Sequence, residues 1–225
     1  MDIVPKIIRT PLLFVAVMVW LYVLVPLFAP VAYVNGNPNL GKLINDFYEH
    51  FCHQRVERSI FLFSKEAPIQ FYSVGELKDL NYLPDEPRKF ERAIWPEYFG
   101  HDFVGDSQVG YKVPLCIRDI ALYGGYALLL TILLLIKDRL LHKILSFKNL
   151  YLLALILALP MVIDGVAQTF IESIKLDFVA ATYIHSIEKR IITGVLFGFG
   201  VGLATFKLFN TSSLTKSEEK GKIEV

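Results

Sequence analysis

Two stretches of the chain hold its only two cysteines, and both stretches carry further groups that bind metals. In "FYEHFCHQRVERS", Cys52 directly precedes His53. In "VPLCIRDI", Cys116 lies three residues before Asp119, a spacing that suits chelation at the start of a helix. Thiolate, imidazole and carboxylate groups are ligands for zinc, and iron or copper also accept the first two. We therefore interpret Cys52, His53, Cys116 and Asp119 as candidate metal ligands.

The two cysteines allow other interpretations. A Cys52–Cys116 disulfide would persist outside the cytoplasm, and the cysteine count is even. Two free thiols are the third state. Because neighbouring side chains diverge on a regular helix, a metal site that uses both Cys52 and His53 requires an irregular backbone there. The residue types alone leave the metal site, the disulfide and the free thiols open.

Other polar residues occur beside or inside apolar stretches. Asp164 and Gln168 lie four residues apart, so they share one face of a predicted helix, and Arg190 begins another apolar stretch. Arg58 follows the first cysteine motif, and Arg118 lies inside the second. Ionisable groups in a membrane are costly, and they usually pair or serve function. These five residues are the candidate catalytic or anion-binding groups, with an Asp164–Arg190 ion pair as the alternative.

These groups must be positioned by helices that cross a membrane. Hydrophobic residues make up 54% of the chain and charged residues only 20%. Since a bilayer core takes roughly 20 apolar helical residues, we predict membrane-spanning helices at about 11–33, 117–136, 148–170 and 188–208. The alternative is a soluble bundle, which would have to shield four very apolar helices from water. The first stretch could instead be a cleaved signal peptide. Such a peptide has a shorter apolar core and a cleavage site of small residues.

Short basic segments predict the orientation. Lys6 and Arg9 precede the first helix, four basic residues lie within 137–148, and four lysines lie at or after the end of the last helix. All three segments fall on one side of a four-span topology, and the positive-inside rule makes that side cytoplasmic. We expect a multi-pass protein of the cell membrane with both termini in the cytoplasm and residues 35–115 outside. The unusual polar groups then gather near the outer ends of the helices.

The predicted fold is all-α, a polytopic membrane protein with an extracytoplasmic amphipathic helix and an irregular cap. The amphipathic helix is expected over "LGKLINDFYEHF". Gly194, Gly198 and Gly202 repeat every four residues, which lets another helix approach closely. The predicted parts are an N-terminal membrane helix (1–35), an extracytoplasmic segment (36–115) with an inserted cap at about 66–108, three membrane helices (116–209) and a disordered cytoplasmic tail (210–225).

The ordered motifs resemble an uncharacterised prokaryotic membrane-protein family, the domain of unknown function 2085. That family's pattern is CHQ-x-x-x-RS, PLC-x-RC, DG-x-x-Q and R-x-x-TG, and this chain has "CHQRVERS", "PLCIRD", "DGVAQ" and "RIITG". The chain departs from the pattern at Asp119, where the family has another cysteine. By resemblance, three cysteines beside a histidine favour a metal site over a disulfide, and a carboxylate keeps an anionic ligand. The resemblance implies no activity.

We therefore expect an integral membrane protein with a polar, metal-binding pocket at the outer side of a four-helix bundle. Zinc is the expected ion, and no organic cofactor is evident. The expected partners are the lipid bilayer and membrane-complex subunits that contact the cap 66–108, whereas the net charge of +1 gives no sign of nucleic-acid binding. One function class is a metal-handling, transport or membrane-complex subunit. The alternative is a metal-dependent enzyme acting on a lipid headgroup or another membrane-facing substrate, so enzymatic activity stays open.

Overall fold

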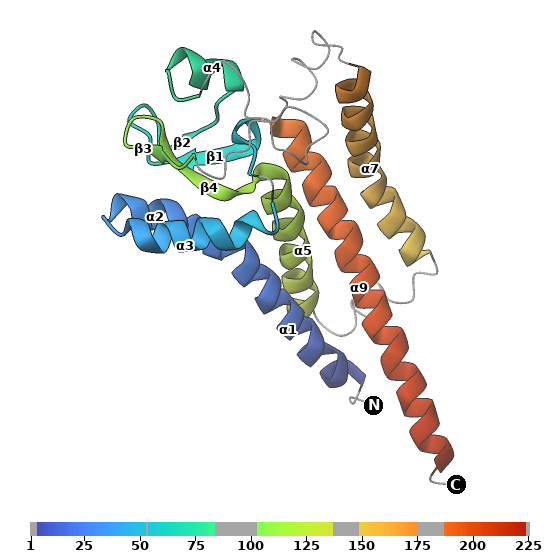
Figure 1. Cartoon of the computed structure of the whole chain (residues 1–225). Helices are drawn as coiled ribbons and strands as arrows, with labels where there is room; N and C mark the ends of the chain where they lie inside the picture. Colours follow the sequence, from blue (N-terminus) through green and yellow to red (C-terminus); the bar gives the residue numbers. More distant parts are fainter. Residues whose placement is uncertain (1–3, 53, 84–102, 137–148, 175–186, 224–225) are drawn as a thin grey trace. The chain divides into compact units, whose positions relative to one another are not determined.

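The computed structural model describes residues 4–52, 54–83, 103–136, 149–174 and 187–223 (Figure 1). The helices are α1 (Val4–Leu24), α2 (Phe28–Val34), α3 (Pro38–Glu49), α4 (Val74–Asp79), α5 (Ile117–Leu135), α7 (Leu150–Ile174) and α9 (Ile187–Ile223). Two short 3-10 helices are η1 (Val25–Leu27) and η2 (Val56–Arg58), and the strands are β1 (Ser59–Leu62), β2 (Ile69–Gln70), β3 (Gly105–Asp106) and β4 (Gly110–Cys116). The predicted helical class is confirmed, although the protein also contains a small sheet.

The four predicted membrane spans are confirmed as helices that are long and apolar enough to cross a bilayer. They cover Thr10–Val34, Ile117–Leu135, Leu150–Gln168 and Ile187–Phe209. Large apolar side chains are exposed along α7, among them Leu155, Ile163 and Val166. Such exposure suits a lipid environment, because lipid tails are as apolar as these side chains.

Helix α9 continues beyond its membrane span to Ile223. The last part of this helix overlaps the predicted tail, 210–225. No proline occurs in 210–223, so no residue there blocks the helix.

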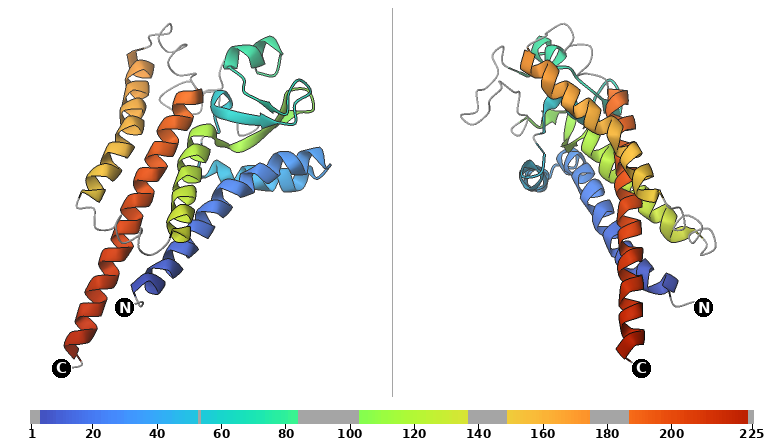
Figure 2. Two further views of the ribbon diagram at one scale, coloured as in Figure 1. Left: turned by 180° about the vertical axis from the view of Figure 1, so that it is seen from behind. Right: turned by 90° about the vertical axis from the view of Figure 1, so that its right-hand side faces the viewer.

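The described residues divide into two compact units. The helical unit contains α1 up to Tyr22, α5 from Ala121, α7, and α9 from Glu188. The sheet unit contains Val23–Ile120. Within the helical unit, α1 begins and α9 ends at the same end of the unit (Figures 1 and 2). An even number of membrane crossings accounts for this arrangement.

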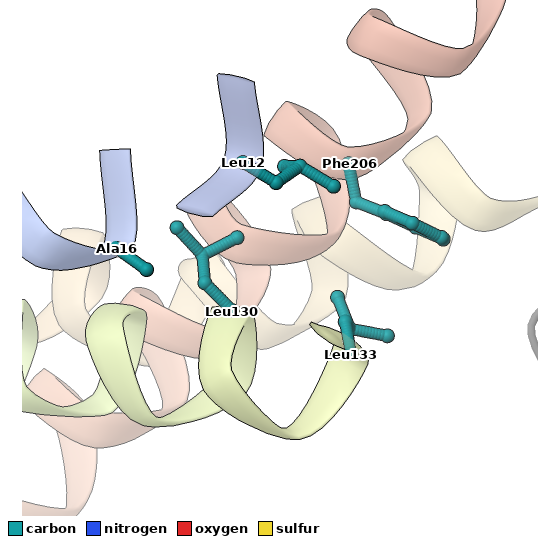
Figure 3. Packing of buried hydrophobic residues seen from close by; sticks show 5 residues of the cluster. All are labelled: Leu12, Ala16, Leu130, Leu133 and Phe206. Atoms are coloured by element: carbon teal, nitrogen blue, oxygen red, sulfur yellow. The ribbon is translucent and has the colours of Figure 1, made fainter. Parts of the chain in front are cut away.

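The helical unit has a core that joins three of its helices. Leu12 and Ala16 of α1 meet Leu130 and Leu133 of α5 and Phe206 of α9 (Figure 3). All five side chains are buried. The indole Nε1 of Trp20 also donates a hydrogen bond to Thr131 Oγ1 at 3.0 Å, which ties α1 to α5.

The glycines of α9 bring its backbone against two neighbouring helices. A Cβ at Gly198 would lie 2.1 Å from the carbonyl oxygen of Leu122 in α5. A Cβ at Gly200 would lie 2.5 Å from the carbonyl oxygen of Ala154 in α7. The close approach predicted from the glycine repeat is therefore present, with α5 as the helix that meets Gly198. Gly200, which lies outside the predicted repeat, brings α9 close to α7.

The sheet unit is built on four antiparallel strands in the order β2-β1-β4-β3. The strands β1 and β4 pair through the middle of the sheet, and buried apolar side chains that include Val56, Phe61 and Leu77 cover it. Helix α4 begins with a capping box between Ser73 and Glu76. Within the predicted cap, 66–108, the described residues form the short elements β2, α4 and β3. Residues 84–102 of that cap lie outside the described part.

Helices α2 and α3 form an antiparallel pair within the sheet unit and lie side by side in every view (Figures 1 and 2). A Cβ at Gly41 of α3 would lie 2.6 Å from the ring of Tyr33 in α2, so glycine permits the contact. The Tyr33 ring also stacks on Tyr111 of β4, with centroids 5.6 Å apart. This stacking fixes the helix pair against the sheet that carries Cys116.

Candidate metal centre

Cys116 is positioned by the pairing of the two central strands. It is the last residue of β4 and pairs with Ser59, the first residue of β1. The register shifts between Ser59 and Phe61, so β4 bulges opposite β1, and Pro114 lies in this bulge. A proline fits there because it has no N–H to donate to a ladder. The hydroxyl of Ser59 donates to the Arg55 carbonyl at 2.9 Å, which holds the start of the strand.

Cys52 is positioned by the chain that leaves α3. The helix ends at Glu49, and the Cys52 N–H still donates to the Tyr48 carbonyl at 3.0 Å. Two residues later, Gln54 has a φ of +49°, in the left-handed region that non-glycine residues rarely adopt. The irregular backbone that the Cys-His pair requires is therefore present. His53 itself lies outside the described residues.

A buried polar network holds this loop in place. The Gln54 amide donates to the Asn45 carbonyl of α3 at 3.0 Å. The ammonium of Lys112, a fully buried residue of β4, donates to Gln54 Oε1 at 3.1 Å. Gln54 therefore connects the loop after Cys52 with α3 on one side and with the strand of Cys116 on the other.

The two thiols meet in the interior of the sheet unit. Cys52 and Cys116 are both buried and both free, and their sulfur atoms lie 2.8 Å apart. Asp119, in the first turn of α5, joins them, and one ligand atom from each of the three residues lies within 4.8 Å of the other two. Three of the four predicted ligands therefore form one cluster, although Cys52 is 64 positions away from Cys116 in the sequence.

The sulfur separation lies between those of two chemical states. A disulfide bond is about 2.05 Å long. Two thiolates on a tetrahedral zinc lie about 3.8 Å apart, given zinc–sulfur bonds of about 2.3 Å. The sulfur atoms would have to move by only about 1 Å to reach either separation.

The electrostatic environment makes the two thiols unequal. The hydrogen bond between them and burial raise the pKa of Cys52, because both favour its protonated form. The same hydrogen bond lowers the pKa of Cys116, and the nearby Arg58 guanidinium acts in the same direction. Cys116 is therefore the thiol that ionises first.

Arg58 and Arg118 lie near the thiols in sequence or in space, but they belong to different elements and have different surroundings. Arg58 ends η2, and its Nε lies 3.9 Å from the buried Glu57 carboxylate, which also pairs with Arg55. Arg118 is the second residue of α5 and is half-buried. The predicted role of both arginines as anion clamps stays a prediction.

The remaining candidate residues belong to the helical unit. Gln168 donates a hydrogen bond to Asp164 Oδ2 at 3.1 Å, and both side chains are buried. Arg190 is also buried, near the start of α9. The polar face of α7 is thus confirmed, whereas the Asp164–Arg190 ion pair stays a prediction. Because the thiol cluster belongs to the other unit, the expected gathering of all these groups also stays a prediction.

Comparison with known proteins finds a family model that matches the part of the chain with the second cysteine motif. Residues 107–204 match the family model DUF2085, described as a predicted membrane protein. The DUF2085 match runs from just before β4 into α9 and includes Cys116, Asp119, Asp164, Gln168 and Arg190. The resemblance is therefore confirmed over these residues, while Cys52 and His53 precede them. No curated protein and no solved structure matches the chain.

Sequence reasoning missed two buried residues that support the thiol cluster without being candidate ligands. Lys112 and Asn45 received no role, although both are buried against the loop of Cys52. The one signal for Lys112 was its position as a lone charge within the otherwise uncharged "GYKVPLC". Nothing in the sequence distinguishes Asn45 from the polar residues beside it.

Proposed function

We propose that this membrane protein binds a zinc ion outside the cytoplasm through Cys52, Cys116 and Asp119, with His53 as the fourth ligand. What supports the proposal is the meeting of two thiols and a carboxylate, each positioned by a different element, within 4.8 Å of one another. Sulfur, nitrogen and oxygen donors in this combination suit zinc, and burial of both thiols protects the site from solvent.

The proposed role is that of a metal-handling protein or a metal-stabilised subunit of a membrane complex. A zinc site with four protein ligands is closed, and closed sites stabilise structure, whereas catalytic sites keep a position open for water or substrate. The alternative of a metal-dependent enzyme acting on a lipid headgroup would need one of the four ligands to be absent. Arg58, which acts on the Cys116 thiol electrostatically, is the group that favours this alternative, since it could attract an anionic headgroup.

Metal analysis of variants tests the proposal. Purified protein is expected to hold one zinc per chain. Cys52→Ala, Cys116→Ala and His53→Ala should each lose it, whereas His50→Ala, which removes an exposed histidine three residues away, should keep it. Asp119→Cys restores the family's cysteine and should retain the metal. A wild-type protein without stoichiometric metal, purified with both thiols reduced, would contradict the proposal.

A Cys52–Cys116 disulfide is the second candidate, because the two sulfur atoms lie only 2.8 Å apart. In this state the two residues would lock α3 to the end of β4 instead of holding an ion. Intact mass measured after alkylation, with and without prior reduction, separates the two. A disulfide predicts alkylation only after reduction, whereas a zinc site predicts alkylation after chelation alone.

A further inference from the structure

Helix α3 exposes its large apolar side chains, whereas a helix on the surface of a water-soluble protein buries them. The side that packs within the sheet unit carries Gly41, Asn45 and Tyr48, all buried. Its large apolar side chains are instead exposed. They are Leu40, Leu43 and Phe47, at 44%, 66% and 56%, with Phe51 just beyond the helix at 58%. Exposed apolar patches of this kind mark an interaction surface.

These four side chains form one continuous stripe. They follow one another at intervals of three, four and four residues, which keeps them on one side of a helix. The charged residues Lys42, Asp46 and Glu49 lie on a different side. The helix therefore has three distinct faces, which are packed, apolar and charged.

The apolar stripe belongs to a helix beside a segment that is long and apolar enough to cross a membrane. The membrane span Thr10–Val34 includes α2, where Phe28 and Val34 are exposed at 59% and 50%. Helix α3 begins at Pro38, four residues after that span ends, and lies beside α2 (Figure 2). A bilayer that surrounds α2 would therefore also reach the apolar stripe of α3.

We propose that α3 is an interfacial membrane anchor whose stripe of Leu40, Leu43, Phe47 and Phe51 lies in the lipid at the boundary between headgroups and acyl chains. The charged face offers one lysine against two carboxylates, so attachment comes from apolar burial and not from attraction to anionic lipids. Since Phe51 directly precedes Cys52, the anchor holds the thiol cluster at the level of the headgroups. The anchor does not depend on whether the thiols bind zinc or form a disulfide.

Photocrosslinking of the full chain in vesicles tests the anchor. Benzoyl-phenylalanine is placed singly at Leu43 or Phe47, and at Asp46 or Glu49 as matched controls on the charged face. The protein is reconstituted into vesicles of phosphatidylcholine alone and irradiated. Adducts are then identified by mass spectrometry, and a monodisperse elution profile in detergent confirms folding of each variant.

The anchor predicts lipid adducts at Leu43 and Phe47 that exceed those at Asp46 and Glu49 by at least about tenfold. Addition of phosphatidylglycerol should leave the yield unchanged. Crosslinked dimers from Leu43 and Phe47 would show that a second copy covers the stripe and would overturn the proposal. Equal lipid yields at all four positions, or no lipid adducts, would overturn it as well.

Discussion

Gln54 links the two elements that carry the cysteines, although it is not itself a candidate ligand. Its amide accepts from Lys112 on the strand of Cys116 and donates to Asn45 on the helix before Cys52. Both bonds are buried, so they are made in a medium where losing a partner is costly. The geometry of the thiol cluster therefore depends on a neutral residue between the two elements.

Replacement of Gln54 by alanine should loosen the metal centre. We expect a loss of stability of about 1–3 kcal/mol from the broken buried hydrogen bonds, and zinc affinity weaker by roughly 10–100-fold, as for other residues that orient ligands. Competition with a chromophoric chelator measures the affinity, and thermal unfolding in detergent measures the stability. Gln108→Ala, at an exposed glutamine of the same sheet unit, should change neither. Equal zinc affinity in Gln54→Ala and wild type would refute this role.

At the scale of elements, α9 is held by backbone contact with its neighbours. Gly198 lies so close to the Leu122 carbonyl that any side chain must push α9 and α5 apart. Such contacts between small residues are the main attraction between helices in lipid, where there is no hydrophobic effect to hold them together.

Gly198→Ala should therefore destabilise the helical unit. Its Cβ would lie 2.1 Å from a backbone oxygen, which cannot move aside as a flexible side chain could. Gly124→Ala is the matched control, because a Cβ there meets nothing within 4 Å. In thermal unfolding in detergent, Gly198→Ala should unfold several degrees below wild type, and Gly124→Ala at or above it. Equal unfolding temperatures for the two variants would be inconsistent with a tight α5–α9 contact.

The buried charges of α7 and α9 should act as a pair. Removal of one partner of a buried ion pair typically costs about 3–5 kcal/mol, because the other charge stays buried without compensation. We expect Asp164→Leu and Arg190→Leu each to be strongly destabilising, and the double variant to cost much less than the sum of the two. Unfolding free energies of the four proteins give the coupling. Additive effects would show that Asp164 and Arg190 are held by different partners.

Across the whole molecule, an even number of membrane crossings places the start of α1 and the end of α9 on one side. The basic residues near these ends predict that this side is cytoplasmic. The sheet unit, with the thiol cluster, would then lie outside the cytoplasm. Only there would the disulfide form of the pair persist.

Labelling of added cysteines in intact cells tests the orientation. A cysteine at Glu66, an exposed position of the sheet unit, should react with a membrane-impermeant maleimide in intact cells. A cysteine appended after Val225 should react only after lysis. The unmodified protein should react weakly in both cases, since Cys52 and Cys116 are buried. The reverse pattern would place the thiol cluster in the cytoplasm.

Sequence reasoning predicted the features that rest on local physics. Long uncharged stretches identified the four spans, and the residue types at Cys52, Cys116 and Asp119 identified a cluster that the structure brings together. It missed the small sheet, because β2 and β3 have two residues each and the bulge at Pro114 hides the periodicity of β4. It also missed Lys112 as a support of the site. Burial of a lysine depends on pairing between residues more than 50 positions apart, and no local pattern records that pairing.

X-ray absorption at the zinc edge of the purified full-length protein tests the metal centre most directly. The account predicts two sulfur atoms at about 2.3 Å and two nitrogen or oxygen atoms at about 2.0–2.2 Å. Asp119→Cys should raise the number of sulfur ligands to three. A spectrum with only nitrogen and oxygen ligands would contradict the account, because it would show that the thiols of Cys52 and Cys116 do not hold the ion.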